Sequence, residues 1–168
     1  RRRRLERVRD PLRRTETACA YALLFKGLNG LYAWSTPAAM ERTERGKPFF
    51  PAHPEIHFSI SHTRGAALVG IYDRPVGVDI ERIRPVSDRM LRRFSGTATE
   101  YEFYAQWTRY ESAVKQSGEG LATLRPREAL TGRFFFSFEP FPGYAACVCT
   151  ETEEEPAPLR CFSVEELL

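Results

Sequence analysis

The chain has 168 residues, and its content of 42% hydrophobic and 28% charged residues is ordinary for a soluble globular protein with a hydrophobic core. No run approaches the roughly 18 to 20 apolar residues that would span a bilayer, and no apolar stretch typical of a secretory leader follows the basic start. These features exclude a membrane protein and favour a cytoplasmic protein that folds as one compact unit.

The formal net charge is only +3, but the charges are unevenly placed, because residues 1–14 hold eight arginines. No aromatic residues are interleaved with these arginines, so the run does not indicate nucleic acid binding. It is either a solvated helix start or an anion-binding edge, and the sequence leaves both interpretations open.

The first predicted element is a helix over residues 15–28, where apolar residues recur at helical spacing. Gly27 and Gly30 are expected to end this helix, because glycine commonly follows the last helical turn. Residues 36–54 are rich in proline and charge, so we expect this segment to be irregular.

Three strands are predicted next, at residues 56–60, 66–72 and 76–81. The last two are separated by residues 73–75, which read DRP and are typical of a tight turn. We therefore expect the three strands to form one antiparallel sheet.

The second part of the chain begins with two predicted helices, at residues 86–94 and 99–116, the latter closed by Gly118 and Gly120. Alternating apolar residues then predict three more strands, at residues 132–138, 144–150 and 159–163. Together these elements predict the α+β class, in which helices are segregated against antiparallel strands.

Two carboxylates stand on the third predicted strand, where residues 77–81 read GVDIE. Side chains two apart on a strand point to the same face, so Asp79 and Glu81 lie side by side while the apolar residues of this stretch face a core. Neighbouring carboxylates are typical ligands of a hard cation such as Mg²⁺. The alternative is an exposed strand end with two solvated acids.

A second motif lies on the long predicted helix, where residues 107–115 read WTRYESAVK. Residues four apart share a helix face, so Glu111 and Lys115 lie one above the other. A third carboxylate beside an ammonium suits Mg²⁺ and a phosphate-bearing substrate. The same spacing also suits a simple helix ion pair, and we expect Trp107 to be a packing anchor.

These two motifs, with GKP at residues 46–48 and FSISH at residues 58–62, closely resemble the 4′-phosphopantetheinyl transferases of the larger, surfactin-synthetase-activating type. The resemblance runs from about Arg42 to the C-terminus, and the four motifs follow in family-like order and spacing. It implies that the chain is an enzyme of this family.

The resemblance also implies two similar packed halves, about 1–85 and 86–168, each with antiparallel strands and helices. The active site would lie in the cleft between the halves. The chain is short for the larger type, which leaves open how many of the N-terminal coenzyme A contacts it has.

The residues that the resemblance assigns to coenzyme A binding are Arg42, Gly46, Lys47, Pro48, Ser61, His62 and Lys115. Ser61 and His62 would contact the phosphates, whereas Lys47 and Arg42 would meet the nucleotide part and its 3′-phosphate. Glycine permits close backbone approach and proline fixes the turn, so the loop is a rigid place from which cations can meet a phosphate. A solvated basic loop is the alternative.

The implied reaction is Mg²⁺-dependent transfer of 4′-phosphopantetheine from coenzyme A to a serine of an acyl or peptidyl carrier protein. Asp79, Glu81 and Glu111 would hold Mg²⁺, with Glu111 also the candidate base. Lys115 and His62 would stabilise phosphate oxygens.

We expect coenzyme A and an acidic carrier protein of fatty acid, polyketide or nonribosomal peptide synthesis as partners. Nucleic acid and membranes are not expected partners. Because both motif sets lie in one chain, we expect a functional monomer.

Two other functions stay open. A shortened relative could bind coenzyme A or a carrier protein without transferring anything. A metal-dependent nuclease would also use acidic residues, a lysine and a basic tail, although the acid-x-Lys strand signature typical of such nucleases is absent. Coenzyme A turnover, DNA cleavage and mass analysis of the carrier would separate the three.

Overall fold

The structure is a computed structural model that describes residues 11–94, 99–120 and 130–167. Its elements in chain order are α2 (Pro11–Tyr32), β1 (Glu41–Arg42), β2 (Pro48–Phe49), β3 (His57–Thr63), β4 (Ala66–Tyr72), β5 (Gly77–Arg82), α3 (Asp88–Phe94), α4 (Glu100–Ser117), β6 (Phe134–Phe138), β7 (Tyr144–Thr150) and α6 (Val164–Leu167). Most of the arginine-rich start lies outside the described residues. The mixture of helices with antiparallel strand pairs agrees with the predicted α+β class.

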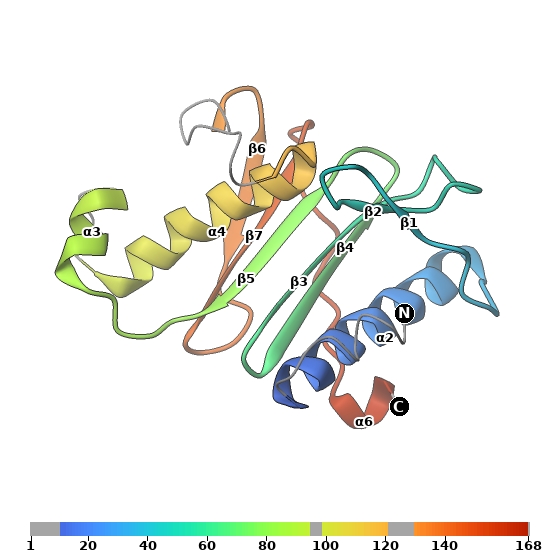
Figure 1. The fold of residues 1–168 in the computed structure, drawn as a ribbon, viewed down its shortest axis with the longest axis horizontal. Coiled ribbons are helices and arrows are strands. Elements are labelled where there is room, and N and C mark those ends of the chain that lie inside the picture. The colour runs from blue at the N-terminus through green and yellow to red at the C-terminus, as the bar shows by residue number, and fades with distance from the viewer. Residues whose placement is uncertain (1–10, 95–98, 121–129, 168) are drawn as a thin grey trace.

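Within the described residues the strands form three antiparallel sheets. β1 pairs with β2, β3 pairs with β4, and β7 pairs with both β5 and β6. Figure 1 shows the strands side by side in the order β6, β7, β5, β3 and β4, with α4 against β5 and β7 and α2 against β3 and β4. Each of the two larger sheets therefore has its own long helix.

The prediction of one antiparallel sheet for residues 56–81 is wrong. The three strands exist close to their predicted bounds, but β5 pairs with β7 and not with β4. Its partner comes from far along the chain, and a local pattern does not show such a pairing. As a result β5, which the sequence places in the half 1–85, joins the sheet of the other half. Residues 159–163, also predicted as a strand, have no regular structure.

Helix α2 is longer than the predicted helix over residues 15–28, so Gly27 and Gly30 lie inside it instead of ending it. A Cβ atom on Gly27 would lie 2.7 Å from Cδ1 of Ile71 on β4. The missing side chain thus lets the helix pack closely on the sheet. Burial outweighs the roughly 1 kcal/mol that glycine costs in a helix.

The segment 36–54, predicted to be irregular, holds the short hairpin of β1 and β2. Gly46 lies in its turn with φ of +90°, a conformation that favours glycine, and its N–H donates to the Thr43 carbonyl at 2.9 Å. The hairpin places the predicted GKP loop on a hydrogen-bonded turn.

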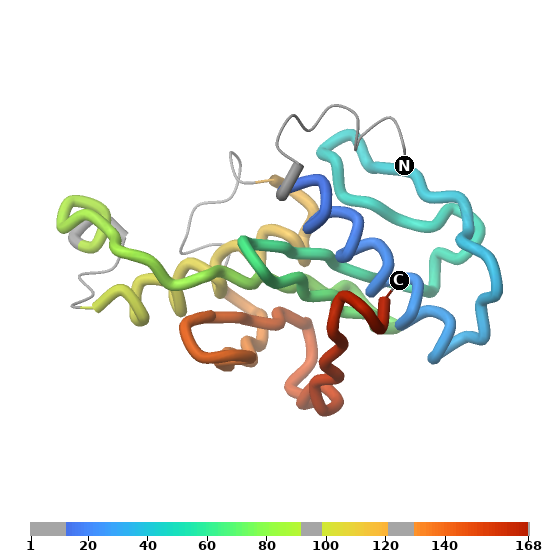
Figure 2. Tube along the Cα trace, turned by 90° about the horizontal axis from the view of Figure 1, so that it is seen from below, coloured from blue at the N-terminus to red at the C-terminus, as the bar shows by residue number. Residues whose placement is uncertain are grey.

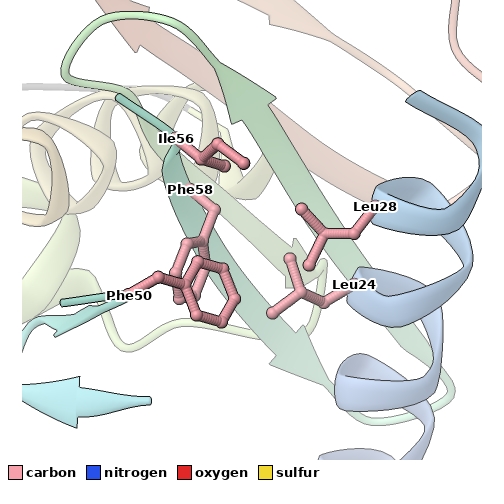
Figure 3. Close-up of a cluster of buried hydrophobic side chains, with 5 residues drawn as sticks. All are labelled: Leu24, Leu28, Phe50, Ile56 and Phe58. Atoms are coloured by element: carbon pink, nitrogen blue, oxygen red, sulfur yellow. The ribbon is translucent and has the colours of Figure 1, made fainter. Parts of the chain in front are cut away.

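The buried hydrophobic residues form separate clusters, one packed against α2 and the others on the sheet of β5 and β7. Figure 3 shows the cluster between α2 and the strands, formed by Leu24, Leu28, Phe50, Ile56 and Phe58. Three clusters involve the sheet of β5 and β7. The first contains Leu68, Val76, Val78, Ile80 and Ala146, the second Tyr110, Ala113, Val114 and Cys149, and the third Phe103, Tyr104 and Ala145.

After β7 the chain returns to the first helix, and Figure 2 shows the C-terminal segment ending beside α2. The Tyr72 hydroxyl donates to Glu154 at 3.1 Å, and the Lys26 amine donates to the Glu166 carbonyl at 2.8 Å. The C-terminal segment, which follows β7, is thereby hydrogen-bonded to β4 and α2. No helix among the described residues is long and apolar enough to cross a membrane.

Candidate functional site

Helix α4 carries the second sequence motif and is capped at both ends. The Thr99 hydroxyl accepts from the Glu102 N–H while the Glu102 carboxylate accepts from the Thr99 N–H. At the other end Gly118, with φ of 73°, donates its N–H to the Val114 carbonyl. Gly118 was predicted to close this helix, and the prediction is confirmed.

Strand β5 alternates as the sequence predicts. Val78 and Ile80 are 0% and 1% exposed in the core, and Asp79 points to the other face, where it is only 3% exposed. Asp79 is covered because α4 lies very close to the start of β5: a Cβ atom on Gly77 would lie 1.9 Å from the Ser112 carbonyl oxygen. The Asp79 carboxylate is therefore buried, and the alternative of a solvated acid at this position is wrong.

The Asp79 carboxylate forms the centre of a cluster contributed by three elements. The Lys115 ammonium on α4 lies 2.6 Å from Asp79 Oδ1, and the Ser61 hydroxyl on β3 donates to the same oxygen at 2.7 Å. Lys115 also donates to the Ser61 hydroxyl at 2.8 Å. Among the described residues the ion pair of Lys115 is with Asp79, whereas the sequence offered Glu111 as its helix partner.

Negative charge accumulates beside this ion pair. Asp79 Oδ2 is buried and has no hydrogen-bond partner among the described residues. Burial, followed by the charge of Asp79, raises the pKa of Glu111 from 4.5 to about 7, although Lys115 acts in the opposite direction. Burial and the Asp79 charge also raise the pKa of Glu81, which accepts a hydrogen bond from the Thr63 hydroxyl at 3.0 Å. The three carboxylates thus repel one another.

The three carboxylates are not assembled as a metal site in this arrangement. In the part of the chain that the structure describes, no group of three or more His, Cys, Asp or Glu side chains could hold a metal ion as it stands. The chemistry of Asp79, Glu81 and Glu111 nevertheless fits a hard cation, because they offer oxygen ligands, a buried oxygen without a partner and concentrated negative charge.

His62 points away from the cluster of Ser61, Asp79 and Lys115, because consecutive strand residues face opposite sides. Its Nε2 atom lies 3.4 Å from the Thr17 hydroxyl, and its Nδ1 atom lies 3.9 Å from the Glu16 carboxylate on α2. The structure therefore brings Ser61 to Asp79 and Lys115 but places His62 against the first helix.

The cations of the GKP hairpin point in different directions. The Lys47 amine donates to the carbonyl of Gln116, the residue after Lys115, at 2.5 Å, and burial lowers the pKa of Lys47. Arg42 donates to the Gly46 carbonyl at 2.5 Å and to the Tyr21 hydroxyl at 3.1 Å. Lys47 is thus adjacent to the motif of α4, whereas Arg42 is held between its own hairpin and α2.

A cavity of about 440 Å³ opens beside Lys47 and Pro48. Its walls include three aromatic rings, those of Phe49, Phe50 and Phe58. Arg133 donates to Gln116 Oε1 at 2.9 Å, and Gln116 Nε2 donates to Glu151 at 2.7 Å. These three polar residues were not predicted from the sequence, because only Gln116 lies beside a motif and the other two come from distant segments.

A row of hydroxyls on β3 faces β5 and is formed by Ser59, Ser61 and Thr63, which we call the hydroxyl seam. Of these three residues only Ser61 was predicted from the sequence to belong to the site. Backbone N–H groups of β5 donate to these hydroxyls: Val78 to Ser59 at 3.0 Å, Ile80 to Ser61 at 3.3 Å and Arg82 to Thr63 at 3.4 Å. The donors and acceptors both advance by two residues, so β3 and β5 run in the same direction. The strict alternation of hydroxyl residues on β3 is a sequence signal that could have indicated this contact.

The chain is similar in sequence to several curated 4′-phosphopantetheinyl transferases. It is 30% identical over 156 residues to 4′-phosphopantetheinyl transferase Sfp of Bacillus subtilis (strain 168), covering 74% of this chain and 68% of the relative. It is 32% identical over 155 residues to 4′-phosphopantetheinyl transferase ffp of Bacillus subtilis, with the same coverage of both chains. A third relative, 4′-phosphopantetheinyl transferase psf-1 of Bacillus pumilus, is 25% identical over 193 residues, covering 97% of this chain and 82% of the relative. A scan of protein-family models found no match.

Proposed function

The chain belongs to the 4′-phosphopantetheinyl transferases, and on this premise we propose that it transfers the 4′-phosphopantetheine arm of coenzyme A to a serine of an acyl or peptidyl carrier protein. The observation that carries the proposal is the cluster in which the partly exposed Lys115 ammonium meets the buried Ser61 hydroxyl and Asp79 carboxylate. The cluster lies where β3, β5 and α4 meet and unites three of the motifs through which the sequence resembles the family.

Coenzyme A would bind with its pyrophosphate at this cluster and its nucleotide part toward the GKP hairpin. Lys115 has an ammonium with three donors, of which two are used by Asp79 and Ser61, so it can still donate to a phosphate oxygen. Lys47 lines the adjacent cavity and is assigned to the nucleotide part, with Arg42 beside it on the hairpin. His62 reaches the phosphates only from the α2 side of β3.

In the transfer step the carrier serine oxygen attacks the phosphorus that bears the pantetheine arm. The bond from this phosphorus to the oxygen bridging the two phosphates breaks, and 3′,5′-bisphosphoadenosine leaves with the bond's electron pair. Glu111 would accept the serine proton as the general base. Lys115 stabilises the negative charge on the departing phosphate.

Mg²⁺ fits the same group of residues, and Asp79, Glu81 and Glu111 would hold it. When bound, it supplies positive charge that neutralises the pyrophosphate oxygens. The partners are therefore coenzyme A and a carrier protein, with a monomer as the proposed functional unit because one chain contributes every residue of the site.

The test is incubation of the chain with coenzyme A, Mg²⁺ and a panel of apo carrier proteins from fatty acid, polyketide and nonribosomal peptide synthesis, read by intact mass. We expect one carrier to gain the mass of one phosphopantetheine. The matched control is Lys115→Met, which should leave the carrier unmodified. Binding of coenzyme A without any mass gain across the panel would instead support a relative that only binds, and cleavage of DNA would support a nuclease.

A further inference from the structure

Each hydroxyl of the seam has a proton left to donate after its oxygen has accepted an N–H from β5. Ser61 donates this proton to Asp79 Oδ1 at 2.7 Å, and Thr63 donates to Glu81 Oε2 at 3.0 Å. In both cases the residue with the carboxylate directly precedes the residue whose N–H donates to the same hydroxyl: Asp79 precedes Ile80, and Glu81 precedes Arg82. Because a strand repeats every two residues, the same double contact occurs twice along the seam.

Ser59 makes the backbone contact of the seam without holding a carboxylate. It accepts from the Val78 N–H, but the residue before Val78 is Gly77, whose position is closed to any side chain by the backbone of α4. The seam therefore contains an internal comparison. Ser59 only joins the two strands, whereas Ser61 and Thr63 join the strands and also orient an acid.

The two acids differ in how strongly they are held. Asp79 is fixed by Lys115 as well as by Ser61. For Glu81, Thr63 is the hydrogen-bond donor that the described residues supply. Thr63 lies on β3 and Glu81 on β5, so this one hydrogen bond ties the orientation of Glu81 to the junction of the two sheets.

We propose that Thr63 is a positioning residue for the transfer reaction. Its hydroxyl holds the Glu81 carboxylate in the orientation in which this carboxylate binds Mg²⁺. This proposal rests on the proposed function, in which Glu81 is one of three acids at the pyrophosphate. A hydrogen bond to a charged acceptor contributes more than one between neutral groups, so its loss should weaken Mg²⁺ binding about tenfold.

The experiment compares Thr63→Val, which has nearly the same shape without a hydroxyl, with Thr63→Ser, which keeps the hydroxyl. Ser59→Ala is the matched control, because it removes a seam hydroxyl that contacts no acid in the part of the chain that the structure describes. Two quantities are measured for each variant: the Mg²⁺ concentration that gives half-maximal holo-carrier formation, and the rise in melting temperature caused by Mg²⁺ alone at constant ionic strength. The melting temperature without Mg²⁺ reports any structural damage.

We expect Thr63→Val to need about tenfold more Mg²⁺ than wild type, both for half-maximal holo-carrier formation and for the same rise in melting temperature. Thr63→Ser should stay close to wild type in both. Ser59→Ala should lower the melting temperature without Mg²⁺ but keep the wild-type response to Mg²⁺. The proposal is overturned if Thr63→Val responds to Mg²⁺ like wild type, if Ser59→Ala loses the response equally, or if the wild type shows no response. A wild type that forms no holo carrier refutes the proposed function, and the melting measurements still decide whether Thr63 supports Mg²⁺ binding.

Discussion

Replacing Glu111 by Gln should stabilise the folded protein at alkaline pH, because it removes a carboxylate that is ionised in an unfavourable place. The pKa of Glu111 rises from 4.5 to about 7, chiefly through burial and secondly through the charge of Asp79. A rise of this size corresponds to roughly 3 kcal/mol against the ionised form. Glu111 is partly accessible to water, so solvent screening reduces the expected gain to about 1–2 kcal/mol.

The pH dependence of this gain follows from proton binding. Between about pH 4.5 and 7 the folded protein binds more protons at Glu111 than the unfolded chain does, so the wild type loses stability as the pH rises through this window. The penalty is complete above about pH 7 and absent below about pH 4.5. Glu111→Gln should therefore be more stable than the wild type at about pH 8 and equal to it at about pH 4.5.

Urea unfolding of the two proteins across this pH range measures the difference directly. Titrating groups that do not interact with Glu111 affect both proteins equally and cancel in the comparison, whereas relief of the repulsion with Asp79 and Glu81 is part of the expected gain. Glu153→Gln removes a carboxylate at an exposed position, so it controls for the general effect of losing one negative charge. Mg²⁺ should reduce the difference by stabilising the wild type. Equal stability of Glu111→Gln and the wild type at about pH 8 would refute the argument that burial and Asp79 act against the ionised carboxylate.

Three further predictions concern the same region. Lys115→Met should lower the free energy of unfolding by about 2 kcal/mol, because it leaves the buried Asp79 carboxylate without its cation. Adding Asp79→Asn should recover much of this loss, and urea unfolding of the single and double variants measures it. If the losses of the two substitutions simply add, the prediction is wrong. Lys47→Ala should raise the KM for coenzyme A more than the KM for 3′-dephospho-coenzyme A, because the second substrate lacks the 3′-phosphate that Lys47 is proposed to contact. Equal increases in the two KM values would place Lys47 away from the 3′-phosphate. Gly77→Ala should lower stability by about 3 kcal/mol or prevent folding, since its Cβ would lie 1.9 Å from the Ser112 carbonyl oxygen; an unchanged melting temperature would show that α4 can move.

The sequence by itself determined the features that depend on residues close together in the chain. The alternation of GVDIE placed Val78 and Ile80 in the core, and the polar start and glycine end of α4 placed the helix bounds within one residue. These signals are local, because capping and strand alternation involve residues only a few positions apart. The ordered motifs were also sufficient to indicate the family that the relatives then showed.

Only the tertiary structure decided which local elements meet. The pairing of β5 with β7, the glycine inside α2 and the choice of Asp79 as the partner of Lys115 all involve residues from separate segments. Glu111 was a possible partner for Lys115 by spacing, but the close approach of α4 to β5 at Gly77 brings the lysine to a buried carboxylate on another element. A buried charge needs a partner far more than a solvated one does, so packing determined this ion pair where helical spacing alone could not.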